Sequence, residues 1–335
     1  MPKHQVLIIG GGSIGERHVR CFLRTGNAEV SLCEINPELR ERLSAQYEIN
    51  GLYDDLDQAL AGKPELAVVC TPAHLHIRHA MACARAGAHL LIEKPLSTSP
   101  EGIDDLLNLI SERNLIAGVA YTLRCHPMLT AMRAAWQTGE FGKPLHVTVV
   151  SGQHFPLYRP AYRNIYYTDR ATGGGAIQDA LTHLVNAVEW IVGPATEVAA
   201  DAQHQFLDGV TVEDTVNLIA RHGETLATFS LNQYQAPNET SITIVGERGT
   251  TRYEAHNTRW LAAIEPGADW QVRDACSMER DDMFVEQAQR TLHAIEGQGP
   301  VTCTLDEARQ TLRVNLAVLA AADNRKWIPV TQTPA

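Results

Sequence analysis

The chain has 335 residues, 44% hydrophobic and 20% charged, which suffices for two domains that each bury a core. A formal net charge of −11 argues against a nucleic-acid-binding protein, and no stretch approaches the roughly 18 consecutive apolar residues of a membrane span. Seven cysteines without a C-x-x-C pair argue against a disulfide framework or a zinc ribbon, so we expect reduced thiols and a cytoplasmic location.

The first third of the chain alternates short apolar runs with helical patterns. Because the first apolar run leads directly into glycines, it predicts a strand and not a signal peptide. Asn36 and Pro37 are typical of a helix start, and Gly26 of a helix end. Strands alternating with helices predict a parallel sheet. The expected strands are 4–10, 28–35, 65–72, 88–95 and 115–122; the expected helices are 13–26, one from 37, 76–87 and 99–114.

After about residue 125 the pattern changes to alternating, β-branched runs joined by short turns. These runs, at 144–155, 215–223, 226–235, 240–249 and 250–257, predict an antiparallel sheet. Helices at roughly 127–138, 174–192 and 283–296 would cover one face of it. We therefore expect a domain of residues 1–125 and a domain of residues 126–335. A last helix at about 305–323 could pack back on the first domain, and a cleft between the domains is the default ligand site.

A glycine-rich turn joins the first expected strand to the first helix. Gly10 would allow the tight turn, Gly12 the approach of a pyrophosphate, and Gly15 close packing of helix and strand. Glu34 ends the second strand, where a carboxylate accepts hydrogen bonds from a ribose 2′-hydroxyl and repels a 2′-phosphate. The pattern therefore predicts a dinucleotide site and favours NAD over NADP. The residues of this turn expected to contact the cofactor are Gly10, Gly12, Ser13, Ile14 and Gly15.

The stretch from residue 68 to 97 carries a resemblance to a known family. It contains Thr-Pro-x-x-x-His, a helix, Ala-Gly, a strand and Glu-Lys-Pro, and further motifs follow at 124–129, 173–183 and 245–250. The chain resembles the Gfo/Idh/MocA oxidoreductases, dehydrogenases and reductases of sugars and cyclitols, over essentially its whole length. The motif positions in the first stretch are Thr71, Pro72, His76, Ala86, Gly87, Glu93, Lys94 and Pro95.

The resemblance implies a Rossmann domain followed by an α/β domain with a large, open, mostly antiparallel sheet that forms a homodimer or homotetramer. It implies NAD(P) in the cleft, with Thr71, Pro72, His76 and Glu93 added to the cofactor site, although Glu93 could instead be structural. It also implies a catalytic set of Lys94, Asp179 and His183. Asn186 departs from the family, which often has Asp there, so any auxiliary role for that position is in doubt.

Asp179 and His183 lie four residues apart, on one face of an expected helix. They could be a metal pair, an acid–base pair or two core residues. Zinc needs at least three protein ligands and no third is indicated, so we expect no metal. His183 is the natural base for a hydroxyl proton, and Lys94 could stabilise the alkoxide; Lys94 could instead be the base. Asp179 would orient either residue or bind a substrate hydroxyl.

Substrate contacts are expected from the segment before the catalytic helix. Four of the nine tyrosines lie between 158 and 167, with arginines interleaved. Aromatic faces stack on sugar rings and arginines pair with carboxylates or phosphates. The alternative is a loop packed on a neighbouring subunit. His126 could face the cleft or be structural. The expected substrate-binding residues are Lys94, Arg124, Tyr158, Arg159, Tyr162, Arg163, Asp179 and His183.

These residues favour an NAD-dependent dehydrogenase of a secondary hydroxyl on a sugar, sugar acid, glycoside or cyclitol ring, or the reverse ketoreductase. Two other classes stay open. One is a glycoside-cleaving enzyme that uses NAD without net turnover, and the other is a non-catalytic sensor of NAD and sugar. The three classes differ in one observable: NADH formed, a glycosidic bond broken, or ligand bound with neither.

Overall fold

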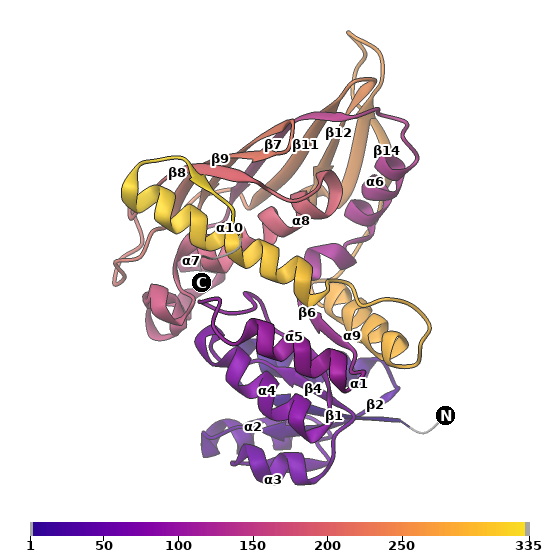
Figure 1. The fold of residues 1–335 in the computed structure, drawn as a ribbon, viewed down its shortest axis with the longest axis vertical. Helices are drawn as coiled ribbons and strands as arrows, with labels where there is room; N and C mark the ends of the chain where they lie inside the picture. The colour runs from indigo at the N-terminus through magenta and orange to yellow at the C-terminus, as the bar shows by residue number, and fades with distance from the viewer. Residues whose placement is uncertain (1–2, 332–335) are drawn as a thin grey trace. The chain divides into compact units, whose positions relative to one another are not determined.

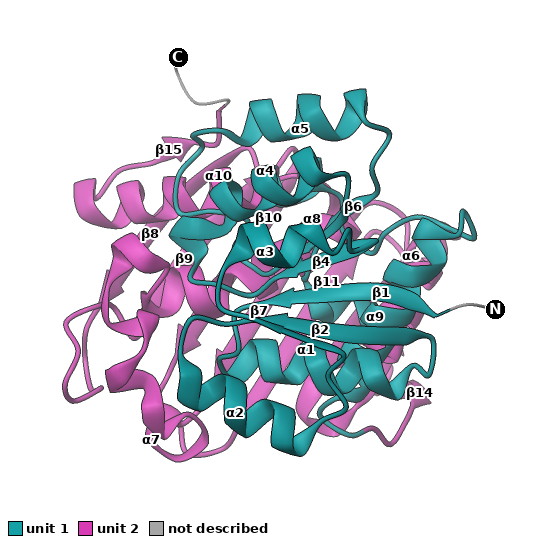
Figure 2. Ribbon diagram, turned by 90° about the horizontal axis from the view of Figure 1, so that it is seen from below, with its two compact units in different colours: residues 1–125, 279–309 teal, residues 126–278, 310–335 magenta. Residues whose placement is uncertain are grey.

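The computed structural model describes residues 3–331, and the chain divides into two compact units (Figures 1 and 2). Unit 1 consists of residues 1–125 and 279–309, and unit 2 of residues 126–278 and 310–335. No helix within residues 3–331 is long and apolar enough to cross a lipid bilayer.

Unit 1 is built on a six-stranded sheet in which every pair of neighbouring strands is parallel. The strands are β1 (His4–Ile9), β2 (Ala28–Cys33), β3 (Gly51–Tyr53), β4 (Leu66–Val69), β5 (His89–Ile92) and β6 (Ala117–Val119). The strand order β3-β2-β1-β4-β5-β6 reverses at β1 and β4, which is the doubly wound arrangement with its ligand crevice outside the carboxyl ends of the strands. The predicted Rossmann domain is confirmed.

The helices of unit 1 begin and end largely where local sequence dictates. The Asn36 side chain accepts hydrogen bonds from the N–H groups of Glu38 and Leu39, and Gly26 takes a positive φ of 73° after α1. Strand β3 and helix α3 escaped sequence analysis, because both are very short. The helices are α1 (Ser13–Arg24), α2 (Pro37–Gln46), α3 (Leu56–Ala61), α4 (His76–Ala86), α5 (Ile103–Glu112) and α9 (Asp282–Ile295).

The sequence predicted that the helix at 283–296 covers the antiparallel sheet, but this helix, α9, belongs to unit 1. Its Ala288 and Leu292 are buried in the same apolar cluster as Ile8 of β1. Asp281, the residue that precedes α9 in the chain, accepts hydrogen bonds from the Arg20 guanidinium of α1, including one of 3.0 Å. Apolar burial and this ion pair together attach α9 to the helix that follows the glycine turn.

Unit 2 is built on a nine-stranded sheet in the order β14-β13-β12-β11-β7-β10-β9-β8-β15. Strands β7 and β10 pair in parallel and the other neighbours are antiparallel, so the predicted mostly antiparallel sheet is confirmed. The strands are β7 (Pro144–Gly152), β8 (Glu197–Gln203), β9 (Thr215–His222), β10 (Thr225–Asn232), β11 (Glu239–Gly246), β12 (Gly249–Glu254), β13 (Arg259–Ala263), β14 (Gln271–Ala275) and β15 (Ile328–Pro329).

Helices pack on one face of this sheet and leave the other open (Figure 1). Burial alternates strictly along β9 and nearly so along β10, as expected for a sheet with one covered face. The helices are α6 (Pro127–Gln137), α8 (Thr182–Val192) and the part of α10 (Leu305–Asn324) that follows residue 309. Asn315 of α10 donates a hydrogen bond of 2.9 Å to the Thr182 hydroxyl, so α8 and α10 are joined within the unit.

Between β7 and α8 the chain forms a run of short turns with a small core of its own. Phe155, Tyr162 and Tyr167 are buried against Leu207 and neighbouring apolar residues. The turns are α7 (Phe155–Tyr158), η3 (Pro160–Asn164), η4 (Tyr166–Thr168), η5 (Arg170–Thr172) and the π-helical turn η6 (Ile177–Leu181). The sequence predicts a continuous helix over 174–192, whereas the structure begins it with a π turn.

Candidate active site

The glycine turn has the geometry that a dinucleotide site requires. Gly10 has a φ of 96°, which favours glycine, and a Cβ on Gly15 would lie 1.8 Å from the Gly10 carbonyl oxygen. A Cβ on Gly12 would meet nothing within 4 Å, and no side chain caps the N-terminus of α1 there. The free N–H groups and open space therefore suit a phosphate. Ser13 begins α1 at the surface, and Ile14 packs against the unit 1 core.

Glu34 lies beside this turn, at the carboxyl end of β2. Its two carboxylate oxygens accept hydrogen bonds from the N–H of Gly11 at 2.5 Å and from the N–H of Asn36 at 2.8 Å. A carboxylate in this position can accept hydrogen bonds from the free hydroxyls of a ribose. Arg40, one turn into α2, was not among the residues predicted here; its guanidinium donates a hydrogen bond of 2.6 Å to the Glu34 carbonyl oxygen. Its spacing of six residues from Glu34 was the only signal in the sequence.

His76 connects the loops that follow β4 and β5. Its buried ring nitrogens lie 2.7 Å from the Thr71 carbonyl oxygen and 2.9 Å from the Pro95 carbonyl oxygen, and burial lowers its pKa. Both nitrogens are thus engaged inside unit 1. Pro72 precedes a 3₁₀ turn, and the Lys94–Pro95 peptide bond is cis. The ring, which can donate to either carbonyl oxygen, lies between the segments that carry Thr71 and Lys94.

Glu93 is a buried carboxylate directly before Lys94. It lies 2.7 Å from Nε2 of His18, also buried, and accepts a hydrogen bond of 3.0 Å from the Lys94 N–H. Burial raises the pKa of Glu93, but the hydrogen bond and charge of His18 together with the Lys94 charge outweigh it and hold the pKa below its usual range. This geometry ties α1, which follows the glycine turn, to the end of β5. Of the two roles considered for Glu93, cofactor contact and structural support, this geometry favours structural support.

Arg124 is a buried residue of unit 1. Its guanidinium donates hydrogen bonds to Glu307 at 2.6 Å and to the Thr302 carbonyl oxygen at 3.2 Å. This cation pairs with an acid far along the chain, and its contact with a substrate stays a prediction. His126 is also buried. Its ring accepts from the Met128 N–H at the start of α6, and burial lowers its pKa to about 4.

Asp179 lies on the π turn and His183 is the second residue of α8. The Asp179 side chain is only 3% exposed. The Tyr166 hydroxyl donates a hydrogen bond of 2.7 Å to its Oδ1, and Nη1 of Arg159 lies 3.9 Å from its Oδ2. The segment of short turns therefore contacts the aspartate of the expected catalytic set. Tyr166 was absent from the expected site, although its position among the clustered tyrosines was a signal.

The other expected substrate ligands divide between surface and core. Tyr158 and the Arg159 side chain are each 45% exposed. Tyr162 is buried and donates a hydrogen bond of 2.7 Å to the Asp208 carbonyl oxygen. Arg163 extends over Tyr162 and forms an ion pair of 3.3 Å with Asp208. Tyr162 therefore lies in the core of this segment, and its contact with a substrate stays a prediction.

The glycine run at 173–175 allows the chain to pack closely on itself. A Cβ on Gly174 would lie 2.3 Å from the Tyr167 carbonyl oxygen, and one on Gly175 would lie 2.3 Å from the Glu213 carboxylate. Further along α8, the buried Asn186 amide donates a hydrogen bond of 3.0 Å to the Thr311 hydroxyl. An ionised Asp has no donor, which accounts for an amide at this position.

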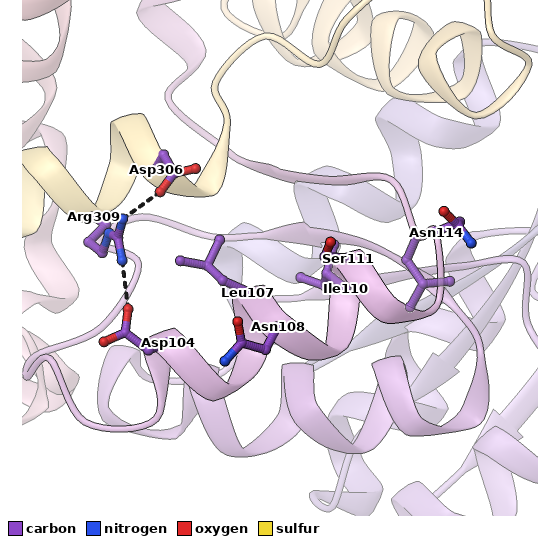
Figure 3. Close-up of a pocket in the computed structure, with 9 residues that line it drawn as sticks. Asp104, Leu107, Asn108, Ile110, Ser111, Asn114, Asp306 and Arg309 are labelled. Atoms are coloured by element: carbon purple, nitrogen blue, oxygen red, sulfur yellow. Dashed lines mark hydrogen bonds and ion pairs between the residues drawn. The ribbon is translucent and has the colours of Figure 1, made fainter.

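Unit 1 also has a hollow of about 580 Å³, which is separate from the predicted site residues (Figure 3). Arg309 spans it, with ion pairs of 2.6 Å to Asp104 and 2.7 Å to Asp306. No residue predicted for the site lines it. Within residues 3–331 no three His, Cys, Asp or Glu residues are grouped so that they could hold a metal ion. The lining residues are Asp104, Leu107, Asn108, Ile110, Ser111, Asn114, Leu115, Asp306 and Arg309.

Two domain families match this chain in the order of its units. Residues 4–121 match an oxidoreductase family with an NAD-binding Rossmann fold, and residues 129–252 match the GFO/IDH/MocA C-terminal domain. Together the matches cover more than two thirds of the chain. The chain belongs to the Gfo/Idh/MocA family. It is an NAD(P)-dependent oxidoreductase that acts on CH–OH groups, and the resemblance seen in its motifs is confirmed.

The chain is also similar to individual proteins of known name. Levoglucosan dehydrogenase from Pseudarthrobacter phenanthrenivorans is 25% identical over 60% of this chain and 54% of its own length. The 1,5-anhydro-D-fructose reductase from Ensifer adhaerens is 25% identical over 94% of this chain and 95% of its own. A structure of levoglucosan dehydrogenase with NADH and levoglucosan superposes with a TM-score of 0.88, covering 98% of this chain and all of that one. At 19% identity, that likeness shows the fold.

Proposed function

We propose that this Gfo/Idh/MocA protein is an NAD-dependent dehydrogenase of a secondary hydroxyl on a sugar, sugar acid, glycoside or cyclitol ring, or the reverse ketoreductase. One observation carries the proposal: Lys94 follows the carboxyl end of parallel strand β5, on a segment fixed by Glu93 and His76. Ligands of this fold bind at that edge. The relatives named for levoglucosan and 1,5-anhydro-D-fructose support a carbohydrate substrate.

The cofactor in this proposal is held by backbone and one carboxylate. Gly12 and the uncapped N-terminus of α1 would hold the pyrophosphate, and Glu34 the adenosine ribose hydroxyls, which favours NAD over NADP. The nicotinamide ring of bound NAD would supply the hydride acceptor. Thr71, Pro72, His76 and Glu93 would shape the site; the last two act through the backbone, since both side chains are buried.

The substrate chemistry requires a base and a group that stabilises negative charge on oxygen. In our proposal His183 takes the hydroxyl proton as the hydride leaves the same carbon, and the Lys94 ammonium stabilises the alkoxide. The second assignment makes Lys94 the base. Asp179 orients these groups or binds a neighbouring hydroxyl. Tyr158, Arg159 and Arg163 are the proposed outer contacts, with Arg159 favouring a substrate that carries a carboxylate or phosphate.

The proposal is tested by NADH formation with a panel of polyols, hexoses, uronates, glycosides and nucleotide sugars. Wild type, Lys94→Ala and Lys143→Ala are compared, Lys143 being an exposed lysine of unit 2. We expect turnover in wild type and Lys143→Ala that Lys94→Ala loses. Equal turnover in all three proteins would remove Lys94 from the catalytic set. Glycoside cleavage without accumulating NADH, or saturable binding without either product, would identify one of the two other classes.

We also propose that the open face of the unit 2 sheet joins copies of the chain into a homodimer or homotetramer. Ile219 is 47% exposed and Leu226 43% exposed on adjacent strands of this sheet. Paired copies would bury such residues. Light scattering should give a multiple of 36.8 kDa for wild type and a smaller mass for an Ile219→Arg, Leu226→Arg variant. A monomeric wild type would refute the proposal.

A further inference from the structure

The short turns before α8 contact both oxygens of Asp179. The Tyr166 hydroxyl donates a hydrogen bond of 2.7 Å to Oδ1, and the Arg159 guanidinium lies 3.9 Å from Oδ2. A buried carboxylate stays ionised only where hydrogen bonds and charge replace its hydration. Two residues of one segment, seven apart, provide these two kinds of support.

The backbone around Tyr166 is anchored on both sides. Its neighbour Tyr167 is buried in the small core of unit 2, and the Thr172 hydroxyl donates a hydrogen bond of 2.7 Å to the Tyr166 carbonyl oxygen. The close approach of Gly174 to the Tyr167 carbonyl oxygen holds the start of the π turn against the same segment. The anchored backbone restricts Tyr166, so its hydrogen bond to Asp179 costs little additional conformational entropy.

Arg159 is less restrained than Tyr166. Its side chain is 45% exposed and passes over the Phe155 ring, with 5.4 Å from guanidinium carbon to ring centre. At 3.9 Å and partly in solvent, its charge supports the carboxylate less than the shorter hydrogen bond does. The direct donor is thus the stronger of the two supports.

We propose that Tyr166 is the positioning residue of Asp179: its hydroxyl keeps the carboxylate ionised and fixes its orientation, and Arg159 assists through its charge. The inference rests on the proposed function, in which Asp179 takes part in catalysis. It extends that function by assigning the segment of short turns to the catalytic machinery as well as to substrate contact.

Several titratable groups of unit 2 face or flank Asp179. They are Arg159, Tyr166, Tyr167 and, four residues along the helix, His183. Burial raises the pKa of Tyr167, so that phenol stays neutral through the working range. Loss of the Tyr166 donor removes a hydrogen bond made to the ionised form of Asp179, which raises the pKa of this carboxyl.

The first test measures this carboxyl without any substrate. Protein labelled with ¹³C at aspartate carboxyls is titrated by NMR, and the Asp179 signal is identified by its loss in Asp179→Asn. In Tyr166→Phe the midpoint should rise by about one pH unit. The matched control is Tyr47→Phe, which removes a phenol that donates to the Glu16 carboxylate at 3.0 Å in unit 1. An Asp179 midpoint unchanged in Tyr166→Phe would overturn the inference.

The second test is a double-mutant cycle on kcat, with the substrate that the NADH panel identifies. Tyr166→Phe should lower kcat about tenfold and move the acid limb of its pH profile upward, while the affinity for NAD is unchanged. In an Asp179→Asn background the same change should add no further loss, since the hydroxyl acts through the carboxylate. Additive losses would mean that Tyr166 acts elsewhere and would overturn the inference.

The two proposals fail in different ways. If Asp179→Asn abolishes turnover and Tyr166→Phe matches wild type in kcat and midpoint, the inference is wrong and the proposed function stands. If Asp179→Asn itself turns over at the wild-type rate, Asp179 has no catalytic role and the inference falls with that assignment. Arg159→Gln provides a second variant, for which we expect a smaller rise of the Asp179 midpoint than for Tyr166→Phe.

Discussion

The candidate site residues of unit 1 and those of unit 2 are held in different ways. In unit 1 the glycine turn and the Lys94 segment depend on backbone geometry and on buried pairs such as His18–Glu93. In unit 2 the surroundings of Asp179 depend on side chains carried by short turns, including the hydroxyl of Tyr166 and the half-exposed Arg159. Backbone sites tolerate few substitutions, because an added atom meets main chain that cannot move away. Side-chain sites can change their contacts while the fold persists.

The largest effect is expected from adding a single methyl group to the glycine turn of unit 1. Gly15→Ala places a Cβ 1.8 Å from the Gly10 carbonyl oxygen, so α1 has to move. We expect a loss of at least about 3 kcal/mol in the free energy of unfolding, together with loss of NAD binding. Urea denaturation and calorimetric NAD titration provide the measurements. Gly12→Ala is the control: its Cβ meets no protein atom, so stability should hold while NAD binding weakens.

The next effect concerns the buried pair of unit 1. Glu93→Leu leaves His18 and the Lys94 N–H without their acceptor, and should lower the free energy of unfolding by about 3 kcal/mol at pH 7. Because the pKa of Glu93 is lowered in the folded state, the difference should be present above about pH 4.5 and shrink below it. Glu65→Leu, which removes a half-exposed partner of His4, should cost under about 1 kcal/mol. Equal losses of unfolding free energy in the two variants would refute the idea that burial makes the His18–Glu93 pair the more costly one to break.

In unit 2 a buried histidine should make stability depend on pH. The neutral His126 ring caps α6, and its pKa is lowered to about 4 by burial. The unfolded chain binds this proton more readily, so wild type should lose about 2 kcal/mol of stability between pH 7 and pH 5 from this residue. His126→Asn keeps a cap without a titrating group and should flatten the profile over this interval. Parallel profiles of the two proteins in urea denaturation would contradict this assignment.

The smallest effect separates core from binding residues among the tyrosines of unit 2. Tyr162→Phe removes a hydrogen bond to the Asp208 carbonyl oxygen and should cost about 1 kcal/mol in the free energy of unfolding. Its kcat and KM should equal those of wild type, because the ring is buried. A raised KM in thermally stable Tyr162→Phe would return this residue to the substrate site.

Much of unit 1 could be predicted from local sequence. The glycine turn, the Asn36 cap and the parallel strands each follow from signals within about 20 residues, and the Glu34 carboxylate lies beside the turn as its spacing suggested. The surroundings of Arg124, Tyr162 and Gly175 could not be predicted in this way. Their partners are Glu307, Asp208 and Glu213, each more than 35 residues away in the chain.

The sequence by itself determined the order of the elements, the dinucleotide motif and the residue types available for chemistry, because hydrophobic period, turn residues and caps act between near neighbours. Only the tertiary structure decided which polar groups are committed to the core. Arg124 is an ion-pair partner, Glu93 binds His18, and Tyr166 donates to Asp179. Burial and long-range hydrogen bonds arise only once distant segments pack together, so no local pattern specifies them.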